Sequence, residues 1–578
     1  MPTIQPFPHL TSTQNPPPPT KVLGAYQSIF YSRVASGEVK PLVLPHLLYG
    51  IIPVTIYLCI DHRDRPWLYK ARWVVLAGVL WWQFKMLTET GSRSPANGFA
   101  AGLVAAWGMV WATTWLVWER PQWDGKRVRR RKRTRGRSIR EVQNGNITKD
   151  ESKETNVAVN GSINGVNGQE LKKRSVANGS TTSTQYLSNG HTKSHNSSTQ
   201  PDEARNDIWE YYWEPYPEKV LDRLSWIFDL LITFRLPGWN YAIPPLPPLS
   251  RNFKTHDGDL LFPPSSEPKS SKSTRNILVP FRSRDELARY RVPRFIIGYV
   301  LLDIIKTTMM HDPYFIFGPT TYALPPHLAA LHPRILNIYR QVLGGAGIIV
   351  AIELIFSLPP IASLLVPPSI DLPLTFTPPY HPSTWGSPSA LLTQGLAGLW
   401  GTWWHQTFRF GFSAPYDWAI REGFIKHKTI ASRIFALVCA FGISGFLHAS
   451  GSYTETAHTK PLDAPKFFLS QILGIIIQTQ TAYLLKDQFS KLPSWLRKTG
   501  NLLFIFAWLH LTGSWLIDDF SRCKIWLFEP ILFSFTRGLG FGVEEPAGWK
   551  GFYLGKRWEP IDLRWHTGKH WWESGLAI

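Results

Sequence analysis

Apolar residues in this chain gather in long runs, separated by segments rich in Pro, Asn, Ser, Lys or Arg. A membrane-spanning helix needs about 20 mostly apolar residues. Nine stretches approach that length: 42–60, 71–89, 97–118, 294–311, 337–357, 429–448, 467–485, 501–517 and 524–541. The pattern predicts an all-α, polytopic integral membrane protein with about nine transmembrane helices, of which the last two are also compatible with one re-entrant hairpin.

The remaining sequence divides into segments of different character. Residues 1–40 are Pro-rich, 41–118 hold the first three predicted helices, and 119–206 combine a basic run with an Asn/Ser-rich stretch expected to be disordered. Residues 209–241 are aromatic and amphipathic, which predicts a helix in the membrane interface. A Pro-rich loop is expected over 242–292 and a C-terminal tail over 546–578.

The basic residues predict an orientation in the membrane. The formal net charge is +21, and ten Lys or Arg residues lie between 126 and 140, directly after the third predicted helix. Such a run is typical of a cytosolic loop, and this interpretation is favoured over nucleic-acid binding. It predicts a lumenal N-terminus and, with nine crossings, a cytosolic tail. The three cysteines, Cys59, Cys439 and Cys523, show no disulfide or zinc-type spacing, so we expect no metal.

Ionisable side chains within apolar segments are costly and therefore candidates for function. They are Asp303, Lys306, Glu353, His448 and His510. Asp303 and Lys306 are three residues apart on one helical face, where a neutralising pair is favoured over a catalytic one. Glu353 is expected near the cytosolic interface.

His448 lies among small residues, in Gly442-Ile-Ser-Gly-Phe-Leu-His-Ala-Ser-Gly451. Small residues either let helices approach closely or open a cavity around the imidazole. Histidine accepts a proton near neutral pH, so His448 is a candidate general base. The alternative is a hydrogen-bonded histidine that packs two helices.

A second cluster follows a moderately apolar stretch over 390–400. Here Trp404, His405, Gln406 and Arg409 combine an aromatic platform, two hydrogen-bonding side chains and a cation within a few helical turns. The alternative is an aromatic belt at the membrane interface with an Arg extended toward water.

Together the two clusters resemble the wax synthase-like branch of the membrane-bound O-acyltransferases. That branch carries a Trp-Gly-x-x-Trp-His/Asn-Gln-x-Phe-Arg-type motif, as in 400–409 here, and then Ser-Gly-x-x-His-x-x-Gly, as in 444–451. Residues 235–240 also resemble an Arg-Gly-x-Gly-Trp-Asn signature of fungal members, with Leu236 and Pro237 as departures. The resemblance marks 207–545 as the acyltransferase region.

The resemblance implies acyl transfer from acyl-CoA, with a short donor such as acetyl-CoA favoured, to a lipophilic alcohol such as a hydroxylated terpenoid or a fatty alcohol. His448 would be the general base. His405 and Gln406 would orient the donor or stabilise the oxyanion, and Trp404, Gln406 and Arg409 would bind substrate. Acyl-CoA is a co-substrate, no bound cofactor is implied, and the membrane is the endoplasmic reticulum by family likeness. Oligomeric state is not indicated.

Three alternatives remain open at this stage. A polytopic transporter predicts a two-fold internal repeat, which the sequence does not show. The spacing of His458 and Asp463 fits the His-x-x-x-x-Asp pattern of glycerolipid acyltransferases, but it falls in a predicted lumenal loop. A scaffold that has kept the fold and lost activity is the third.

Overall fold

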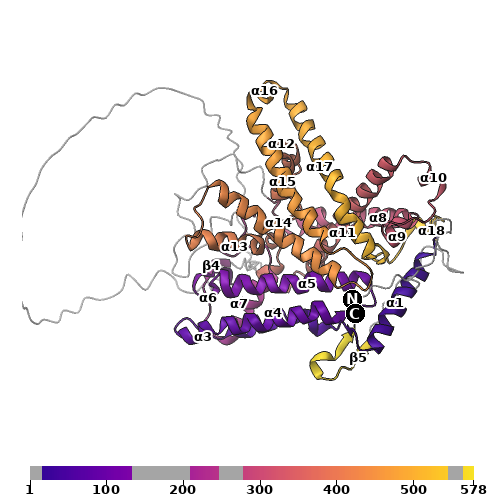
Figure 1. The fold of residues 1–578 in the computed structure, drawn as a ribbon. Helices are drawn as coiled ribbons and strands as arrows, with labels where there is room; N and C mark the ends of the chain where they lie inside the picture. The colour runs from indigo at the N-terminus through magenta and orange to yellow at the C-terminus, as the bar shows by residue number, and fades with distance from the viewer. Residues whose placement is uncertain (1–15, 133–208, 247–277, 371, 544–563, 578) are drawn as a thin grey trace, which may run out of the picture. The chain divides into compact units, whose positions relative to one another are not determined.

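The computed structural model describes residues 16–132, 209–246, 278–370, 372–543 and 564–577 (Figure 1). The chain divides into two units, one formed by Met1–Arg130 with Tyr211–Ile578 and one by Arg131–Glu210, and the first is described below. The predicted disordered stretch lies outside the described residues. The helices of eight or more residues are α1 Pro19–Ala35, α2 Ile52–Cys59, α4 Arg72–Glu89, α5 Pro95–Thr113, α7 Val220–Ile232, α8 Arg284–Met310, α11 Pro333–Leu365, α12 Ser389–Gly398, α13 Arg409–Arg421, α14 Ile430–Tyr453, α15 Asp463–Leu484 and α17 Ser494–Arg522.

Shorter elements connect these helices. The short helices are α3 Pro66–Lys70, α6 Pro121–Asp124, α9 Pro313–Phe317, α10 Pro326–Ala329, α16 Lys486–Lys491 and α18 Phe535–Gly538. The strands pair in twos: β1 Lys40–Pro41 with β2 Thr90–Gly91, β3 Arg127–Lys132 with β4 Trp209–Glu214, and β5 Arg564–His566 with β6 Gly575–Ala577. The all-α prediction is confirmed.

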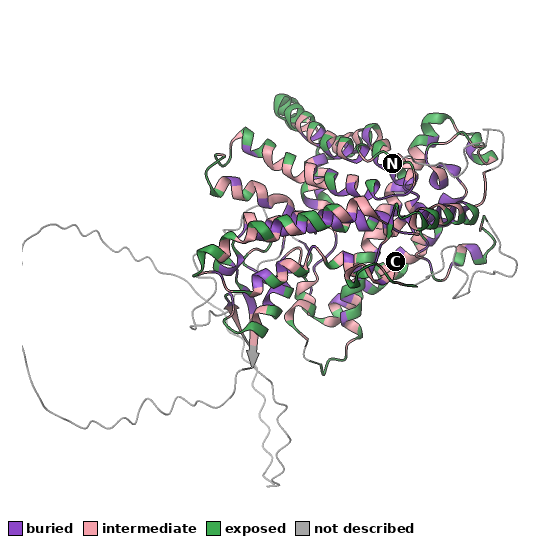
Figure 2. Ribbon diagram, turned by 60° about the horizontal axis from the view of Figure 1, so that its bottom comes forward, coloured by how far each residue is buried: buried purple, intermediate pink, exposed green. Residues whose placement is uncertain are grey.

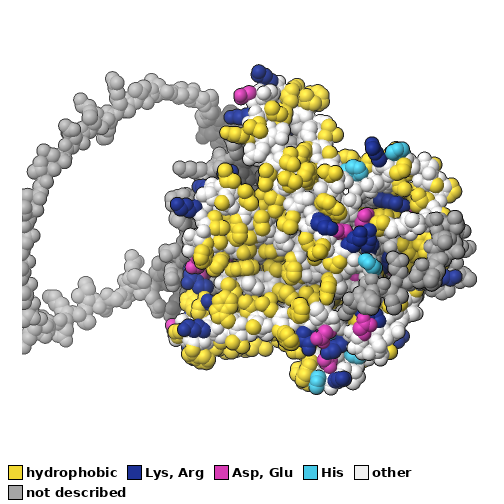
Figure 3. All heavy atoms as spheres, viewed as in Figure 1, with side chains coloured by type: hydrophobic (Ala, Val, Ile, Leu, Met, Phe, Trp, Pro, Cys, Tyr) yellow, Lys and Arg dark blue, Asp and Glu magenta, His cyan; other side chains and the backbone are white. Residues whose placement is uncertain are grey.

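Five helices of the described residues are long and apolar enough to cross a membrane: Pro95–Trp118, Pro333–Leu365, Ile430–Tyr453, Asp463–Leu484 and Ser494–Arg522. Large apolar side chains also cover the outside of α4 and α8, as Val74 (75% exposed) and Ile297 (59%) illustrate. In Figure 3 apolar side chains cover much of the face over α4, α5, α14 and α15. A surface of this kind is expected to contact lipid.

α5 is the most enclosed of the candidate spans, with 67% of its most apolar window buried. Figure 2 shows how buried and exposed residues are distributed over the described chain. The small residues of α5 let a neighbouring helix approach closely: a Cβ atom on Gly102 would lie 2.2 Å from the carbonyl oxygen of Ser450 in α14. In membranes, where water drives no burial between helices, such close packing is a main source of helix association.

Two of the nine predicted spans are not continuous helices. The stretch 42–60 contains a 3₁₀ helix, Leu44–Leu48, and then the eight-residue α2, with Pro45 and Pro53 at the starts of these pieces. A proline cannot donate the helical hydrogen bond, so it begins a helix more readily than it continues one.

The predicted span 524–541 is wrong. It holds only the 3₁₀ helix Ile525–Leu527 and the four-residue α18. The predicted pair on α8 contacts this segment: Asp303 accepts hydrogen bonds from Ser534 Oγ (2.5 Å) and from the backbone N–H of Thr536 (2.9 Å), and Lys306 donates to the carbonyl of Trp526. The buried charges thus satisfy irregular backbone, as irregular structure inside a membrane protein requires.

The two ends of the described chain meet. Lys40 Nζ lies 2.9 Å from Glu573 Oε1, Tyr49 donates a hydrogen bond to the carbonyl of Trp572, and Val43 forms an isolated bridge with Ala577. Residues in such contact cannot lie on opposite sides of a bilayer. The tail is therefore on the same side as Lys40, so the cytosolic placement of the tail opposite a lumenal N-terminus is wrong, and nine crossings are not confirmed.

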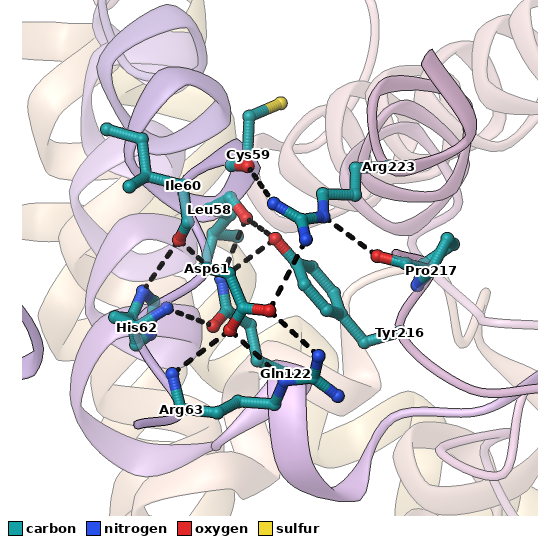
Figure 4. A network of polar contacts seen from close by, with 10 residues as sticks. All are labelled: Leu58, Cys59, Ile60, Asp61, His62, Arg63, Gln122, Tyr216, Pro217 and Arg223. Atoms are coloured by element: carbon teal, nitrogen blue, oxygen red, sulfur yellow. Dashed lines mark hydrogen bonds and ion pairs between the residues drawn. The ribbon is translucent and has the colours of Figure 1, made fainter. Parts of the chain in front are cut away.

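A polar network lies at the C-terminal end of α2 (Figure 4). It joins segments that are predicted from the sequence to be cytosolic. Gln122 Nε2 donates to the carbonyl of Leu58 (2.8 Å), Tyr216 donates to the same carbonyl (2.6 Å), and Arg223 pairs with Asp61 (3.3 Å). These bonds hold α7 against the bundle. The amphipathic helix predicted there is present, although its place in the membrane interface stays a prediction.

Candidate active site

His448 lies on α14 between three phenylalanine rings from three other helices. Its ring stacks on Phe468 of α15 (centroids 5.0 Å apart) and lies 5.8 Å from Phe520 of α17 and 6.2 Å from Phe99 of α5. Nδ1 is enclosed and has no hydrogen-bond partner among the described residues. The hydrogen-bonded packing role considered above is therefore not what the described structure contains, and an unpaired buried nitrogen calls for an explanation.

The glycines near His448 bring neighbouring helices close. A Cβ atom on Gly445 would lie 2.9 Å from Cα of Pro465 in α15, and one on Gly451 would lie 2.8 Å from the ring of Phe99 in α5. Of the two interpretations of the small residues, close approach is confirmed.

His405 is positioned by a loop rather than by a helix. A π-helical turn, Leu399–Trp403, ends at Trp404, and the chain turns before α13 begins at Arg409. The side chain of Gln406 donates to the carbonyls of Trp400 (3.1 Å) and Trp404 (2.6 Å). π-Turns of this kind are frequent at functional sites.

Arg409 completes the support of this loop. Its guanidinium donates to the carbonyl of Gly401 (2.9 Å) and to Oε1 of Gln406 (2.7 Å). Gln406 and Arg409 are thus bonded to the loop itself. Their contact with substrate stays a prediction, and their observed contacts are those of positioning residues.

Aromatic rings connect the two histidines. His405 lies 5.4 Å from Trp404, which lies 5.3 Å from Trp400, and Trp400 lies 6.3 Å from Phe468, the ring that stacks on His448. Nδ1 of His405 is also enclosed without a partner among the described residues. The structure therefore brings the two predicted histidines and Trp404 into one aromatic site.

The other candidates lie outside this site or serve another role. His510 on α17 exchanges hydrogen bonds with Gln341 on α11, with Nδ1 2.7 Å from Oε1, so it joins two helices. Glu353 lies 3.5 Å from the guanidinium of Arg291. No group of three metal-binding side chains is found in the described part of the chain.

Three further residues near His405 were not predicted as site residues: Arg235, Arg291 and His381. Arg235 Nη1 donates to the carbonyl of Ser383 (2.8 Å), and Arg291 donates to the carbonyl of Pro382 (2.7 Å). Both arginines thus hold the segment that carries Trp385, whose ring lies 6.1 Å from that of His405.

The positive charge of Arg235 affects the pKa values of two histidines in loops, His405 and His381. Burial lowers the pKa of Arg235 to about 10, with the charge of Arg291 acting in the same direction, so the guanidinium stays charged at neutral pH. Burial first, and then the charges of Arg235 and His448, lower the pKa of His405 to about 3. Burial and the two arginines lower that of His381 to about 4. Both imidazoles are therefore neutral at pH 7.

The resemblance of residues 235–240 to a family signature was the feature of the sequence that could have marked Arg235 as a candidate site residue. Leu236, where fungal members have Gly, adopts φ 55°, a conformation that Gly reaches without strain. A Gly at this position, as in the signature that the segment resembles, would therefore fit the backbone described here.

Residues 381–470 match the Membrane bound O-acyl transferase family, a segment that holds both histidines. Over this segment the chain is therefore similar to that family. Its relatives include an O-mevalon transferase from Aspergillus niger, 24% identical over 349 residues (57% of this chain and 65% of the relative), and an acetyltransferase from Aspergillus nanangensis, 22% identical over 152 residues (25% and 36%). The chain thus spans less than two thirds of either relative. No solved structure matches.

Proposed function

We propose that this chain is a membrane-bound O-acyltransferase that moves an acyl group from acyl-CoA to the hydroxyl of a lipophilic alcohol. One observation carries the proposal: within the family segment 381–470, a chain of contacting aromatic rings links His405 to His448, and each has an enclosed Nδ1 without a partner among the described residues. A buried imidazole nitrogen without a partner calls for an explanation, and a hydrogen bond to a bound substrate would supply one.

The reaction follows from the proposed roles. His448 removes the proton from the acceptor hydroxyl, and the oxygen attacks the thioester carbonyl. His405, neutral at pH 7, donates a hydrogen bond to the oxyanion that develops on that carbonyl. The C–S bond then breaks, the ester forms, and coenzyme A leaves as the thiol with the proton that His448 removed.

The substrates are proposed from the relatives. An acetyltransferase and an O-mevalon transferase favour a short or polar acyl group over a long fatty chain. The acceptor is proposed to be a hydroxylated secondary metabolite such as a terpenoid, and the membrane to be that of the endoplasmic reticulum.

The test is ester formation in microsomes that contain wild-type protein, His448→Ala or His510→Ala at equal levels. Labelled acetyl-CoA and palmitoyl-CoA are offered with fatty alcohol and hydroxylated terpenoid acceptors. His510 is a matched control, because it lies in a neighbouring helix and bonds to Gln341. We expect ester from wild type and His510→Ala only. Equal ester from His448→Ala would show that His448 is structural.

A further inference from the structure

The guanidinium of Arg235 has unused hydrogen-bonding capacity beside His405. It makes one hydrogen bond, to the carbonyl of Ser383, and pairs with no carboxylate within 4 Å among the described residues. An arginine has five N–H donors. Arg235 is partly buried, and its other nitrogens make no hydrogen bond to a described residue. The bond to Ser383 places these donors next to the segment that carries Trp385.

Arg291 provides the comparison within the same cluster. It is 1% exposed and bonds to the carbonyl of Pro382, to Thr384 Oγ1 (2.8 Å) and to Ser357 Oγ (3.4 Å), with Glu353 at 3.5 Å. Its contacts are those of a structural arginine. Two guanidiniums here face one carboxylate, so one positive charge in the described cluster is uncompensated. A buried charge without a counter-ion is expensive, and a bound anion would balance it.

The backbone holds Arg235 in place without help from a ligand. The N–H of Val128 donates to the carbonyl of Gly238 (2.7 Å), and the N–H of Asn240 donates to the carbonyl of Lys126 (3.0 Å). These bonds join the loop to the start of the basic run, at the end of the bundle predicted to face the cytosol. A substrate that approached His405 from this end would pass near Arg235.

We propose that Arg235 binds an anionic group, phosphate or carboxylate, of a substrate whose reacting end lies at His405. Arginine forms paired hydrogen bonds with the oxygens of both groups. The inference rests on the proposed function. The two sources of such a group are the phosphates of coenzyme A and a carboxylate on the acceptor.

The first test measures binding of coenzyme A and of pantetheine, which lacks the phosphates, to purified protein in lipid nanodiscs. Arg235→Met is compared with Arg235→Lys and with the control Arg291→Met, and each is checked for intact folding by size-exclusion and thermal melting. A charged hydrogen bond contributes about 1.5–3 kcal/mol, roughly 10–100-fold in affinity. We expect Arg235→Met to weaken coenzyme A binding by that factor, to leave pantetheine unchanged, and Arg235→Lys to restore part of the loss.

The second test separates the other source. If coenzyme A binding is unchanged, KM is measured for a carboxylate-bearing alcohol and for its methyl ester. A rise in KM for the acid alone in Arg235→Met assigns the anion to the acceptor. If neither coenzyme A affinity nor this KM changes in a folded variant while wild type forms ester, the Arg235 proposal is overturned and the proposed function stands. If wild type neither binds coenzyme A nor forms ester, both are overturned.

Discussion

His448 lies within a 24-residue helix, whereas His405 lies in a loop between a π-turn and α13. The position of His448 depends on how α14 packs against α5 and α15, through glycines and phenylalanine rings. The position of His405 depends on hydrogen bonds from Gln406 and Arg409 to nearby carbonyls. The two histidines are thus positioned in different ways, His448 by helix packing and His405 by hydrogen bonds within a loop. Different substitutions should therefore displace each of them.

The largest effect on the rate of ester formation is expected from replacing the two histidines, first singly and then together. We expect His448→Ala to lower the rate of ester formation by roughly 10²–10⁴-fold, the usual contribution of a general base. Adding His405→Ala should cost little more, because residues that act in one step are not additive. Rates per inserted protein for the two single variants and the double variant measure this. Fully multiplicative losses would mean that the histidines act independently.

The next largest effect is expected on thermal stability, from substitutions that disturb the helix packing around His448. Gly445→Ala places a Cβ atom 2.9 Å from backbone of α15, whereas one on Gly442 meets nothing within 4 Å. Overpacking costs about 1–3 kcal/mol, so Gly445→Ala should lower the melting temperature in detergent while Gly442→Ala should not. Equal melting temperatures for both variants would mean that α14 and α15 are less tightly fitted than described.

The smallest effect is expected on the side of His405. Arg409→Met removes the bonds to Gly401 and Gln406, so the loop loses support while α14 is untouched. We expect about a tenfold lower rate, equivalent to ~1.4 kcal/mol, with an unchanged melting temperature and partial recovery in Arg409→Lys. A variant that loses melting temperature rather than rate would place Arg409 among the residues that support the fold.

The apolar runs predicted most long helices, since a spanning helix satisfies its own backbone and only needs length and hydrophobicity. They failed at 524–541, where an apolar run is held in irregular form by Asp303, a side chain from a helix more than 200 residues earlier. The composition of the segment itself does not reveal a hydrogen-bond partner so distant in the sequence.

The candidate site likewise combines residues that the sequence predicted with residues that it did not. The spacing of residues in two motifs predicted His405 and His448 as site residues, and a third motif marked the loop that begins at Arg235. The place of Arg235 beside His405 follows from its bond to Ser383, 148 residues away, and could not be predicted from either segment alone. Likewise, His381 acquires its surroundings only when two arginines from distant parts of the chain converge on it.

The contact between the two ends of the chain sets an order of events during synthesis. Lys40 and Glu573 are separated by 533 residues. At about 5–20 residues per second, a ribosome takes roughly half a minute to two minutes to pass from one to the other. Every long helix among the described residues is thus made before Lys40 meets its partner, so this contact forms after those helices have been synthesised. A translation arrest late in the message would leave a nearly complete bundle whose first-made corner is still open.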